Sequence, residues 1–423
     1  MGTIMGIDFG TTNSALALNN KGSVRVANIN NLTSDERTLR SVLLMNKKRG
    51  AEVGQKAVDQ YIRSEGKGCR FLQSLKAFLP DSGFTGTTIF GKSFEIEDLV
   101  AFILTEVKRI GEQKAGHSID RAVLGRPVFF SEDTAKDRLA ESRLRIAAIR
   151  AGISDISFEY EPIAATLAYL GRMDTNTEET VLMGDFGGGT SDFTVMRLRS
   201  DMPTTQEEKR KRILSMGGVY IGGDTFDSRI MWEKLTPYFG RDLTSRDMKG
   251  SSLPMPLWIM HTLCEWHMIP FLRDQKTLEM IREIKRTTDD PRLIENLEHL
   301  VHENKGFSVF QAIEKAKTKL STEMSAVISY SDRHIHLEEP ICRTEFESFI
   351  AKDLNTISDC VVKTLSDAHI STEGIDKVLL TGGSSFVPAV RHIFTKMFGE
   401  HKLVHLDAFT SVAHGLALSA SFH

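Results

Sequence analysis

The sequence predicts a two-lobed α/β fold, and three observations support this prediction. First, the segments Ile4 to Asn19 and Val181 to Leu198 share one pattern, in which an apolar strand, an Asp-Phe-Gly turn and a second apolar strand follow each other. Second, Lys377 to Phe394 has the pattern of a strand, a glycine turn and a helix. Third, 423 residues are enough for two lobes that each bury a sizeable core. The duplicated unit predicts two similar lobes whose turns face each other.

The turn of the second hairpin has the composition of an anion site. Gly187, Gly188 and Gly189 leave backbone N–H groups uncovered and free to adopt positive φ, so the turn can lie against an anion such as phosphate. Asp185 and Asp192 bracket the turn. Carboxylates beside phosphate are tolerable mainly when a hard cation such as Mg²⁺ lies between them. Taken alone, a structural glycine hairpin explains this segment equally well.

The first hairpin repeats the same residue types. Asp8 and Gly10 occupy matching places, and the small hydroxyl residues Thr11 and Thr12 follow. The pair of hairpins therefore predicts one site in which both turns hold the phosphate chain of a nucleotide and its metal ion. In the third element, Gly382 and its neighbours allow a flat ring to approach the backbone, and the helix N-terminus after them favours negative charge.

Hydrophobic periodicity predicts further elements of the first lobe. Alternating apolar residues between Val24 and Val53 indicate more strands, and Asp98 to Ala115 forms an amphipathic helix. A second helix is expected from Ser131 to Ala151, with its arginines, Arg143 among them, on a solvated face. The residues expected to face inward on this helix are Ala135, Leu139, Ile146 and Ile149.

Two segments of the second lobe carry charged residues. Asp201 to Arg212 is polar and charged, which predicts an exposed loop or a frayed helix. Ser308 to Leu320 predicts a helix with a capping box formed by Ser308 and Gln311. Its expected buried stripe is Val309, Ile313, Ala316 and Leu320, and Glu314, Lys317 and Ser321 lie on a different face. By itself that charged face is typical of a solvated surface.

Composition excludes several classes of protein. The formal net charge of -3 gives no electrostatic reason to expect a nucleic-acid or membrane partner. The cysteines, Cys69, Cys264, Cys342 and Cys360, contain no C-x-x-C pair, so neither a disulfide framework nor a zinc ribbon is expected. The first residues lack the pattern of a signal peptide, and the most apolar long stretch contains charged and histidine residues. We therefore expect a soluble, cytoplasmic protein, of undetermined oligomeric state.

Together with Glu161-Pro162 and Gly222-Gly223-Asp224, the three motifs resemble the nucleotide-binding domain of the seventy-kilodalton heat-shock proteins, within the actin-like ATPase superfamily. The resemblance runs from Ile4 to Ala420 and is strongest to short bacterial heat-shock-like proteins. It implies two ribonuclease H-like lobes around a nucleotide cleft. The implied boundaries are 1–180 for lobe I, 181–383 for lobe II with a mobile upper subdomain at about 228–306, and 384–423 for a return to lobe I. No peptide-binding domain is expected.

The resemblance also implies roles for individual residues. Asp8 and Asp185 would hold hydrated Mg²⁺ through water, Lys76 would stabilise charge on the transferred phosphoryl group, Glu161 and Asp192 would position the attacking water, and Thr190 would contact the γ-phosphate. The implied phosphate-binding residues are Gly10, Thr11, Thr12, Asn13, Gly187, Gly188, Gly189, Gly222, Gly223 and Asp224. The implied nucleoside-binding residues are Glu314, Lys317, Ser321, Gly382, Gly383, Ser384 and Phe386. Without the resemblance, Lys76 would be a surface lysine and Glu161 a helix-capping residue.

The chain departs from the family pattern at the base. Phe386 stands where the family usually has an arginine that stacks on adenine, and Thr318 replaces the partner arginine. An aromatic ring can still stack on a base, but the loss of two guanidinium groups changes or weakens purine selectivity. The sequence therefore predicts the phosphate contacts more firmly than the base contacts.

The resemblance implies an ATP-binding, Mg²⁺-dependent, slow ATPase of heat-shock chaperone type. Its cofactors would be ATP or ADP with Mg²⁺, and K⁺ as an optional further cation. Unfolded client proteins and co-chaperones would act in trans. Three alternatives stay open: an actin-like filament protein, a scaffold that binds nucleotide without hydrolysing it, and a sugar kinase. The sugar kinase is the least favoured, because no insertion presents an evident sugar pocket.

Overall fold

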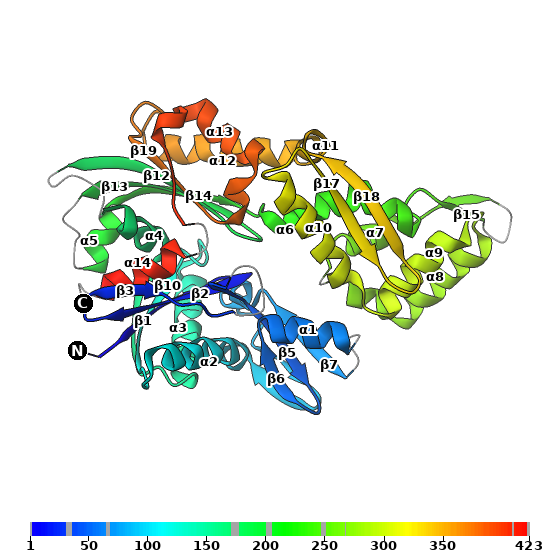
Figure 1. Ribbon diagram of the computed structural model, residues 1–423, viewed down its shortest axis with the longest axis horizontal. Coiled ribbons are helices and arrows are strands. Elements are labelled where there is room, and N and C mark those ends of the chain that lie inside the picture. The colour runs from blue at the N-terminus through cyan, green and yellow to red at the C-terminus, as the bar shows by residue number, and fades with distance from the viewer. Residues whose placement is uncertain are drawn as a thin grey trace.

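Two central β-sheets form the framework of the protein, as the sequence predicts. The computed structural model describes residues 2–30, 36–64, 68–170, 177–199, 205–246, 251–266, 268–407 and 410–420. The first sheet has the order β11 (Asp155–Tyr160), β10 (Arg121–Arg126), β1 (Ile4–Phe9), β2 (Asn13–Asn20) and β3 (Ser23–Val26), and β4 (Thr38–Arg40) also pairs with β2. The second has the order β14 (Ile213–Val219), β13 (Ser191–Arg199), β12 (Glu178–Phe186), β19 (Lys377–Thr381) and β20 (Leu403–His405). The prediction of a two-lobed α/β fold is therefore confirmed (Figure 1).

The duplicated hairpins have the same register. In β1 and β2, Phe9 lies opposite Ser14, and in β12 and β13, Phe186 lies opposite Ser191. Both serines and both phenylalanines are buried, so each turn emerges from a fixed base. Because four residues separate the two members of each pair, the turns have the same length in both sheets.

Two helices separate the sheets. Figure 1 shows α4 (Glu161–Leu170) and α14 (Ser411–Ser419) between the two layers of strands. They cross so closely that a Cβ at Gly415 would lie 1.7 Å from the carbonyl oxygen of Ala164. A Cβ at Gly6 of β1 would lie 2.5 Å from the carbonyl oxygen of Ala413. Glycine at these positions therefore lets α14 pack directly on α4 and on the first sheet.

The remaining elements cover the sheets and extend from one end of each (Figure 1). Those of the first lobe are β5 (Val42–Asn46), β6 (Gly50–Val53), α1 (Gln55–Arg63), β7 (Cys69–Gln73), the 3-10 helix η1 (Leu75–Phe78), β8 (Gly86–Ile89), β9 (Lys92–Glu95), α2 (Ile96–Ala115) and α3 (Thr134–Arg150). The longer elements of the second lobe are α5 (Gln206–Lys211), α6 (Gly223–Ile230), β15 (Thr244–Arg246), β16 (Ser252–Pro254), α7 (Leu257–Leu263), α8 (Gln275–Thr287), α9 (Pro291–His302), α10 (Gly306–Leu320), β17 (Ser325–Ser331), β18 (His336–Cys342), α11 (Arg343–Phe349), α12 (Ala351–Asp367) and α13 (Pro388–Phe398). Its short helices are η2 (Met231–Leu235), η3 (Thr236–Phe239), η4 (Ile269–Arg273), η5 (Gly383–Phe386) and η6 (Glu400–Lys402).

The predicted orientation of α3 is wrong. Ala135, Ile146 and Ile149 are exposed and Leu139 is only half-buried. The buried positions are instead Ala140, Arg143, Leu144, Ala147 and Ala148. The error arises because the buried stripe includes a charged residue: Arg143 enters the interior, where backbone carbonyl oxygens accept its hydrogen bonds.

Two further predictions need correction. The structure begins α10 at Gly306, with Lys305 before it, so Ser308 lies inside the helix and forms no capping box, although the predicted buried stripe is confirmed.

The charged segment at 201–212 is not wholly exposed: its first four residues lie outside the described part, but Lys209 of α5 is only 2 % exposed. The ammonium group of Lys209 forms a buried ion pair with Glu159 of β11.

An aromatic cluster joins the lobes beyond the sheets. Tyr61 of α1 and Phe71 of β7 come from the first lobe, and Trp266 and Phe307 come from the second. The ring centroid of Phe71 lies 4.6 Å from that of Tyr61, 5.6 Å from that of Trp266 and 6.1 Å from that of Phe307. The four rings therefore form a direct contact between the outer parts of the lobes.

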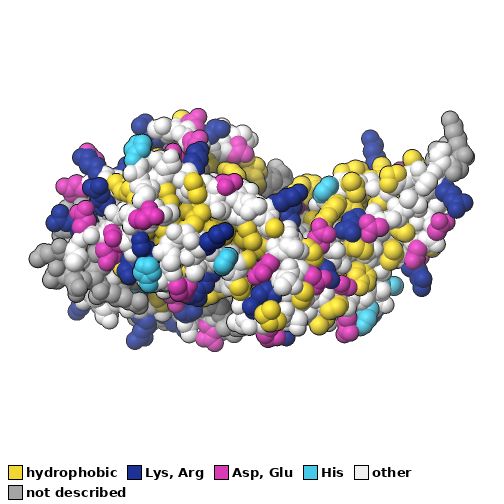
Figure 2. Space-filling model, turned by 90° about the horizontal axis from the view of Figure 1, so that it is seen from above, with side chains coloured by type: hydrophobic (Ala, Val, Ile, Leu, Met, Phe, Trp, Pro, Cys, Tyr) yellow, Lys and Arg dark blue, Asp and Glu magenta, His cyan; other side chains and the backbone are white. Residues whose placement is uncertain are grey.

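The surface is mixed in character. Figure 2 shows acidic and basic side chains interspersed over one face, with hydrophobic side chains gathered on the outer part of the second lobe. Exposed hydrophobic residues of that part include Leu257, Trp258 and Phe271. Within the described residues, no helix is both long enough and apolar enough to cross a bilayer.

Candidate functional site

A cavity of about 1400 Å³ opens between the two sheets. Every site residue predicted from the sequence lines this cavity except Gly222. Gly222 is buried behind the second hairpin, where a Cβ would lie 2.4 Å from the carbonyl oxygen of Gly188. The topology therefore brings residues from the beginning, the middle and the end of the chain to one cavity.

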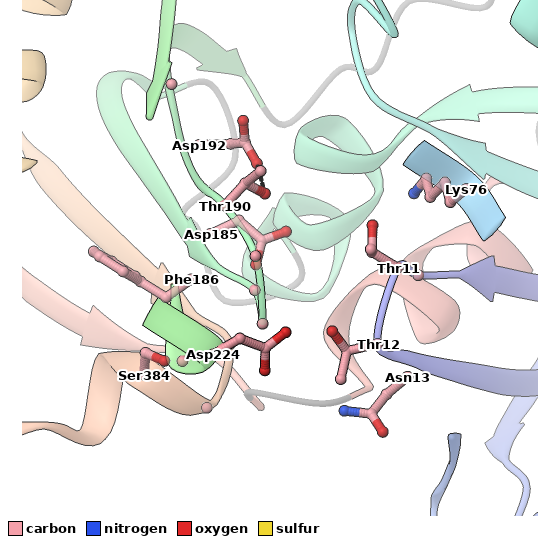
Figure 3. Close-up of a pocket in the computed structure, with 18 of the residues that line it drawn as sticks. Thr11, Thr12, Asn13, Lys76, Asp185, Phe186, Thr190, Asp192, Asp224 and Ser384 are labelled. Atoms are coloured by element: carbon pink, nitrogen blue, oxygen red, sulfur yellow. Dashed lines mark hydrogen bonds between the residues drawn. The ribbon is translucent and has the colours of Figure 1, made fainter. Parts of the chain in front are cut away.

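The tips of the two hairpins meet inside the cavity. A Cβ at Gly188 would lie 2.1 Å from the hydroxyl oxygen of Thr12, so the missing side chain of Gly188 lets the two turns come this close. The backbone N–H of Asp224, at the start of α6, donates to the carbonyl oxygen of Gly188 at 2.7 Å. Figure 3 shows Thr11, Thr12 and Asn13 on one side of the cavity and Asp185, Thr190 and Asp192 on the other. The backbone of both turns and their small hydroxyl groups line a common space, as an anion site requires, and the N–H of Gly187 is used within its own turn, where it donates to the carbonyl oxygen of Thr190 at 2.9 Å.

Three aspartates give this space a strongly acidic character. Burial, together with the charge of Glu161, raises the pKa of Asp8 to about 7. Burial and the neighbouring charge of Asp192 raise the pKa of Asp185 to about 8, and burial also raises the pKa of Asp192. The hydroxyl group of Thr190 donates to Asp192 at 2.8 Å, which partly offsets the effect of burial. Such a cluster holds its negative charge readily only when a cation joins it.

The donor set fits Mg²⁺ held through water. Asp8 and Asp185 supply the hard oxygen atoms that Mg²⁺ prefers, and both line the cavity. Among the described residues, no three His, Cys, Asp or Glu side chains are close enough to bind one metal ion together. Since Mg²⁺ usually keeps several of its waters, a site with few direct protein ligands suits it better than Zn²⁺.

Lys76 brings a positive charge to the same space. The turn η1 carries it, and its Nζ lies 2.6 Å from Oε1 of Glu161, the first residue of α4. Both side chains are largely buried, with 12 % and 14 % of their surfaces exposed. Burial lowers the pKa of Lys76, but the charges of Glu161 and Asp8 outweigh burial and raise it overall. Lys76 is therefore a fixed cation beside the acidic cluster.

Helix α10 contributes the predicted charged face. Lys317 donates to Oδ2 of Asp227 and to the carbonyl oxygen of Gly223, both at 2.8 Å. Glu314 pairs with Arg40 of β4 at 2.7 Å and so links the two lobes. The site prediction does not include Asp227 or Arg40. Asp227 lies three residues after the Gly222-Gly223-Asp224 turn, but nothing local indicates Arg40, which is 274 residues from Glu314 in the chain.

The third element forms the opposite wall of the cavity. Gly382 has φ +85°, and a Cβ there would lie 2.2 Å from the carbonyl oxygen of Phe186, so β19 can join the base of the second hairpin. Phe386 is 49 % exposed, and its ring lies parallel to that of His405, with centroids 6.0 Å apart. Thr318 points its hydroxyl group back to the carbonyl oxygen of Glu314. No local pattern in the sequence indicates that His405 lines the cavity.

Comparisons with known proteins agree with this geometry. The family model described as Hsp70 protein matches residues 80–251 and 302–423. The chain is 27% identical over 425 residues to "Chaperone protein DnaK" of Thermosipho melanesiensis, which covers 99% of this chain and 59% of the relative. Proteins with the same title from Thermotoga petrophila and Thermotoga maritima are 27% identical over 426 residues, with the same coverage. The chain thus spans about three fifths of the length of these curated relatives.

Proposed function

The chain belongs to the Hsp70 family, and from this premise we propose that it binds ATP and ADP with Mg²⁺ and hydrolyses ATP slowly. The observation that carries the proposal is the meeting of the two duplicated turns, in which Gly188 touches Thr12 and both turns face one cavity. A triphosphate chain needs backbone amide donors from more than one direction, and these two turns supply them.

Each group in the cavity has a role in this proposal. The amides of Thr11, Thr12, Gly188 and Gly189 would bind the β- and γ-phosphates, whereas the N–H of Gly187 already donates to the carbonyl oxygen of Thr190. Asp8 with Asp185 would hold the hydrated metal ion. When bound, Mg²⁺ would neutralise charge on the phosphate oxygens.

The remaining side chains would act at the γ-phosphate. Lys76 would stabilise negative charge on the transferred phosphoryl group, Thr190 would contact that group, and Glu161 with Asp192 would orient the attacking water. The wall formed by Ser384 and Phe386 would hold the nucleoside together with Glu314 and Ser321.

We further propose a chaperone-type role, in which nucleotide binding alternates the chain between states that client proteins or co-chaperones distinguish in trans. The support is family membership and the titles of the relatives. All four cysteines are free, which suits a reducing compartment such as the cytoplasm.

Calorimetry tests nucleotide binding. Substituting both Asp8 and Asp185 by Asn should abolish the Mg²⁺-dependent part of ATP binding, because the hydrated ion loses both carboxylates. The matched control is Asp367→Asn at the end of α12, where the side chain is exposed and remote from the cavity. Unchanged Mg²⁺-ATP affinity in the double variant would refute the metal assignment.

Single-turnover hydrolysis of ATP tests the second part of the proposal. A slow release of phosphate that needs Mg²⁺ is expected from the unmodified protein. Tight binding without any phosphate release would instead identify a scaffold that uses nucleotide only as a ligand, since the binding residues would be the same.

A further inference from the structure

Arg143 is a buried arginine that does not line the cavity. It lies on the inner face of α3, and its side chain is 7 % exposed. Its guanidinium group is 3.6 Å from the carboxylate of Glu97 on α2, which balances its charge. Burying an arginine costs free energy unless its N–H donors are hydrogen-bonded. The acceptors of those hydrogen bonds therefore indicate the structural role of Arg143.

Those partners belong to the segment that follows Lys76. One terminal nitrogen of Arg143 donates to the carbonyl oxygens of Phe78, Leu79 and Asp81, at 3.3, 2.9 and 2.8 Å. These carbonyl groups end the η1 turn and the bend after it, since the N–H of Leu79 also donates to the carbonyl oxygen of Lys76. A single guanidinium group therefore gathers three backbone acceptors just beyond the lysine of the site.

Apart from Arg143, the turn is held mainly by short-range contacts: the N–H of Ala77 donates to the carbonyl oxygen of Ser74, and the ring centroid of Phe78 lies 4.9 Å from that of Phe84. It is a 3-10 helix of four residues, a geometry with weaker hydrogen bonds than an α-helix. It starts from Ser74, which has φ +54°, a conformation that a non-glycine residue adopts only under constraint. Only Leu75 of this turn is buried, with Leu79 directly after it. The position of the Lys76 backbone thus depends on what holds the end of the turn.

We propose that Arg143 is a positioning residue, which fixes the turn so that the ammonium group of Lys76 stays between Glu161 and the γ-phosphate position. The inference rests on the proposed function, because it assigns Lys76 to phosphoryl transfer. Arg143 contacts backbone atoms of this segment rather than any lining side chain, so it acts on the cavity through the segment that carries Lys76.

The first experiment compares three substitutions on α3. Arg143→Met keeps an apolar side chain of similar length but has no hydrogen-bond donor. Arg143→Lys keeps a positive charge, and its ammonium group can donate to some of the three carbonyl oxygens. The control is Arg138→Met, an exposed arginine of the same helix. Single-turnover hydrolysis should fall at least about tenfold in Arg143→Met, because misplacing a catalytic group by about 1 Å costs up to about a hundredfold. Arg143→Lys should recover part of the rate, and Arg138→Met should equal the unmodified protein.

Measuring nucleotide affinity distinguishes a specific effect on the position of Lys76 from a general disturbance of the fold. ATP and ADP affinities should stay within about twofold in Arg143→Met, because the hairpin turns lie on other elements, and only the hydrolysis step should slow. An equal loss of affinity and rate would indicate a merely structural role and would overturn the inference. Should Arg143→Met fail to fold, Arg143→Lys gives the same comparison.

A second measurement does not require hydrolysis. The rate at which an amine-reactive acetylating reagent modifies Lys76, followed by peptide mass spectrometry in the protein without nucleotide, reports how firmly the ammonium group is held. It should rise severalfold in Arg143→Met and stay unchanged at Lys92, an exposed lysine of β9. Unchanged labelling of Lys76 would overturn the inference. Failure of the unmodified protein to hydrolyse ATP would count against the proposed function alone, because the labelling result stands without it.

Discussion

The ammonium group of Lys76 lies 2.6 Å from the carboxylate of Glu161, and this contact joins a turn of the first lobe to the first residue of a helix that lies between the sheets. A phosphate that enters the cavity would compete with Glu161 for the lysine. Glu161 would then be released to accept a hydrogen bond from water. Binding of phosphate would thus exchange the partner of Lys76 and free Glu161 to orient the attacking water.

Replacing Lys76 by Met should separate binding from hydrolysis. The hairpin amides remain, so we expect ATP affinity to change by only a few-fold. The rate of hydrolysis should fall about a hundredfold or more, because a fixed cation no longer meets the charge that develops on the phosphoryl group. Calorimetry and single-turnover kinetics measure the two effects, with Lys92→Met as the control. An unchanged rate would exclude Lys76 from the chemistry.

Stability in the absence of ligand should depend on pH through Asp227. Burial raises the pKa of this carboxyl group to about 7, even though Lys317 opposes the shift. A folded-state pKa above the ordinary 3.8 means that the folded state binds more protons than the unfolded state. The contribution of Asp227 to the free energy of unfolding therefore decreases as pH rises from about 4 to about 7.

Denaturant unfolding at several pH values tests this expectation. Asp227→Asn should reduce the decrease between about pH 4 and pH 7, because the amide does not titrate. The rest of the decrease should persist, because the pKa values of Asp8 and Asp185 are also raised. An identical pH dependence in the variant and the unmodified protein would show that Asp227 ionises normally.

The aromatic cluster should slow the release of nucleotide. Because Phe71 contacts rings of both lobes, Phe71→Ala should weaken the contact between the lobes by about 1–2 kcal/mol, which corresponds to about a tenfold faster dissociation. Stopped-flow displacement of a fluorescent nucleotide measures this rate. Phe90→Ala provides the control, since Phe90 is 46% exposed and takes no part in the cluster. Equal dissociation rates in the two variants would show that the cluster does not govern release.

The buried pair of Lys209 and Glu159 should respond differently to single and double substitutions. Lys209→Met removes the buried ammonium group that pairs with Glu159, whose carboxylate keeps a hydrogen bond from the N–H of Tyr160, and we expect it to cost about 3 kcal/mol of stability. Combining it with Glu159→Leu should restore most of that loss, because a buried ion pair contributes little more than apolar residues of similar volume. Denaturant unfolding of the single and double variants decides the matter. An additive, larger loss in the double variant would contradict the argument.

The sequence predicted the hairpins because each depends on residues that are neighbours in the chain. The strand, the Asp-Phe-Gly turn and the returning strand all lie within about twenty residues, so local patterns are sufficient. The orientation of α3 was not predictable in this way. The acceptors of Arg143 lie 62 to 65 residues earlier in the chain, and a charged side chain on an apolar stripe looks like an error in the pattern.

The same reason explains what was missed around the cavity. Lys209 is buried beside its ion-pair partner Glu159, which lies 50 residues earlier in the chain. His405 lines the cavity because β20 pairs with β19 in the second sheet. Such relationships depend on how distant elements meet, and composition carries no information about them. The resemblance supplied the positions of Lys76 and Glu161, which local patterns alone would have assigned to the surface and to a helix cap.

The two hairpins match in backbone but not in chemistry. Asp185 lies directly across from Asp192, whereas Asp8 lies across from Ala15. Opposite residues of neighbouring strands stand about 5 Å apart on one face, so the later copy presents a pair of acids where the earlier copy presents one acid and a methyl group. A symmetric backbone therefore carries an asymmetric set of charges, with two carboxyl groups at this register in the later copy and one in the earlier copy. The two hairpins are therefore not interchangeable in charge, although their turns have the same length.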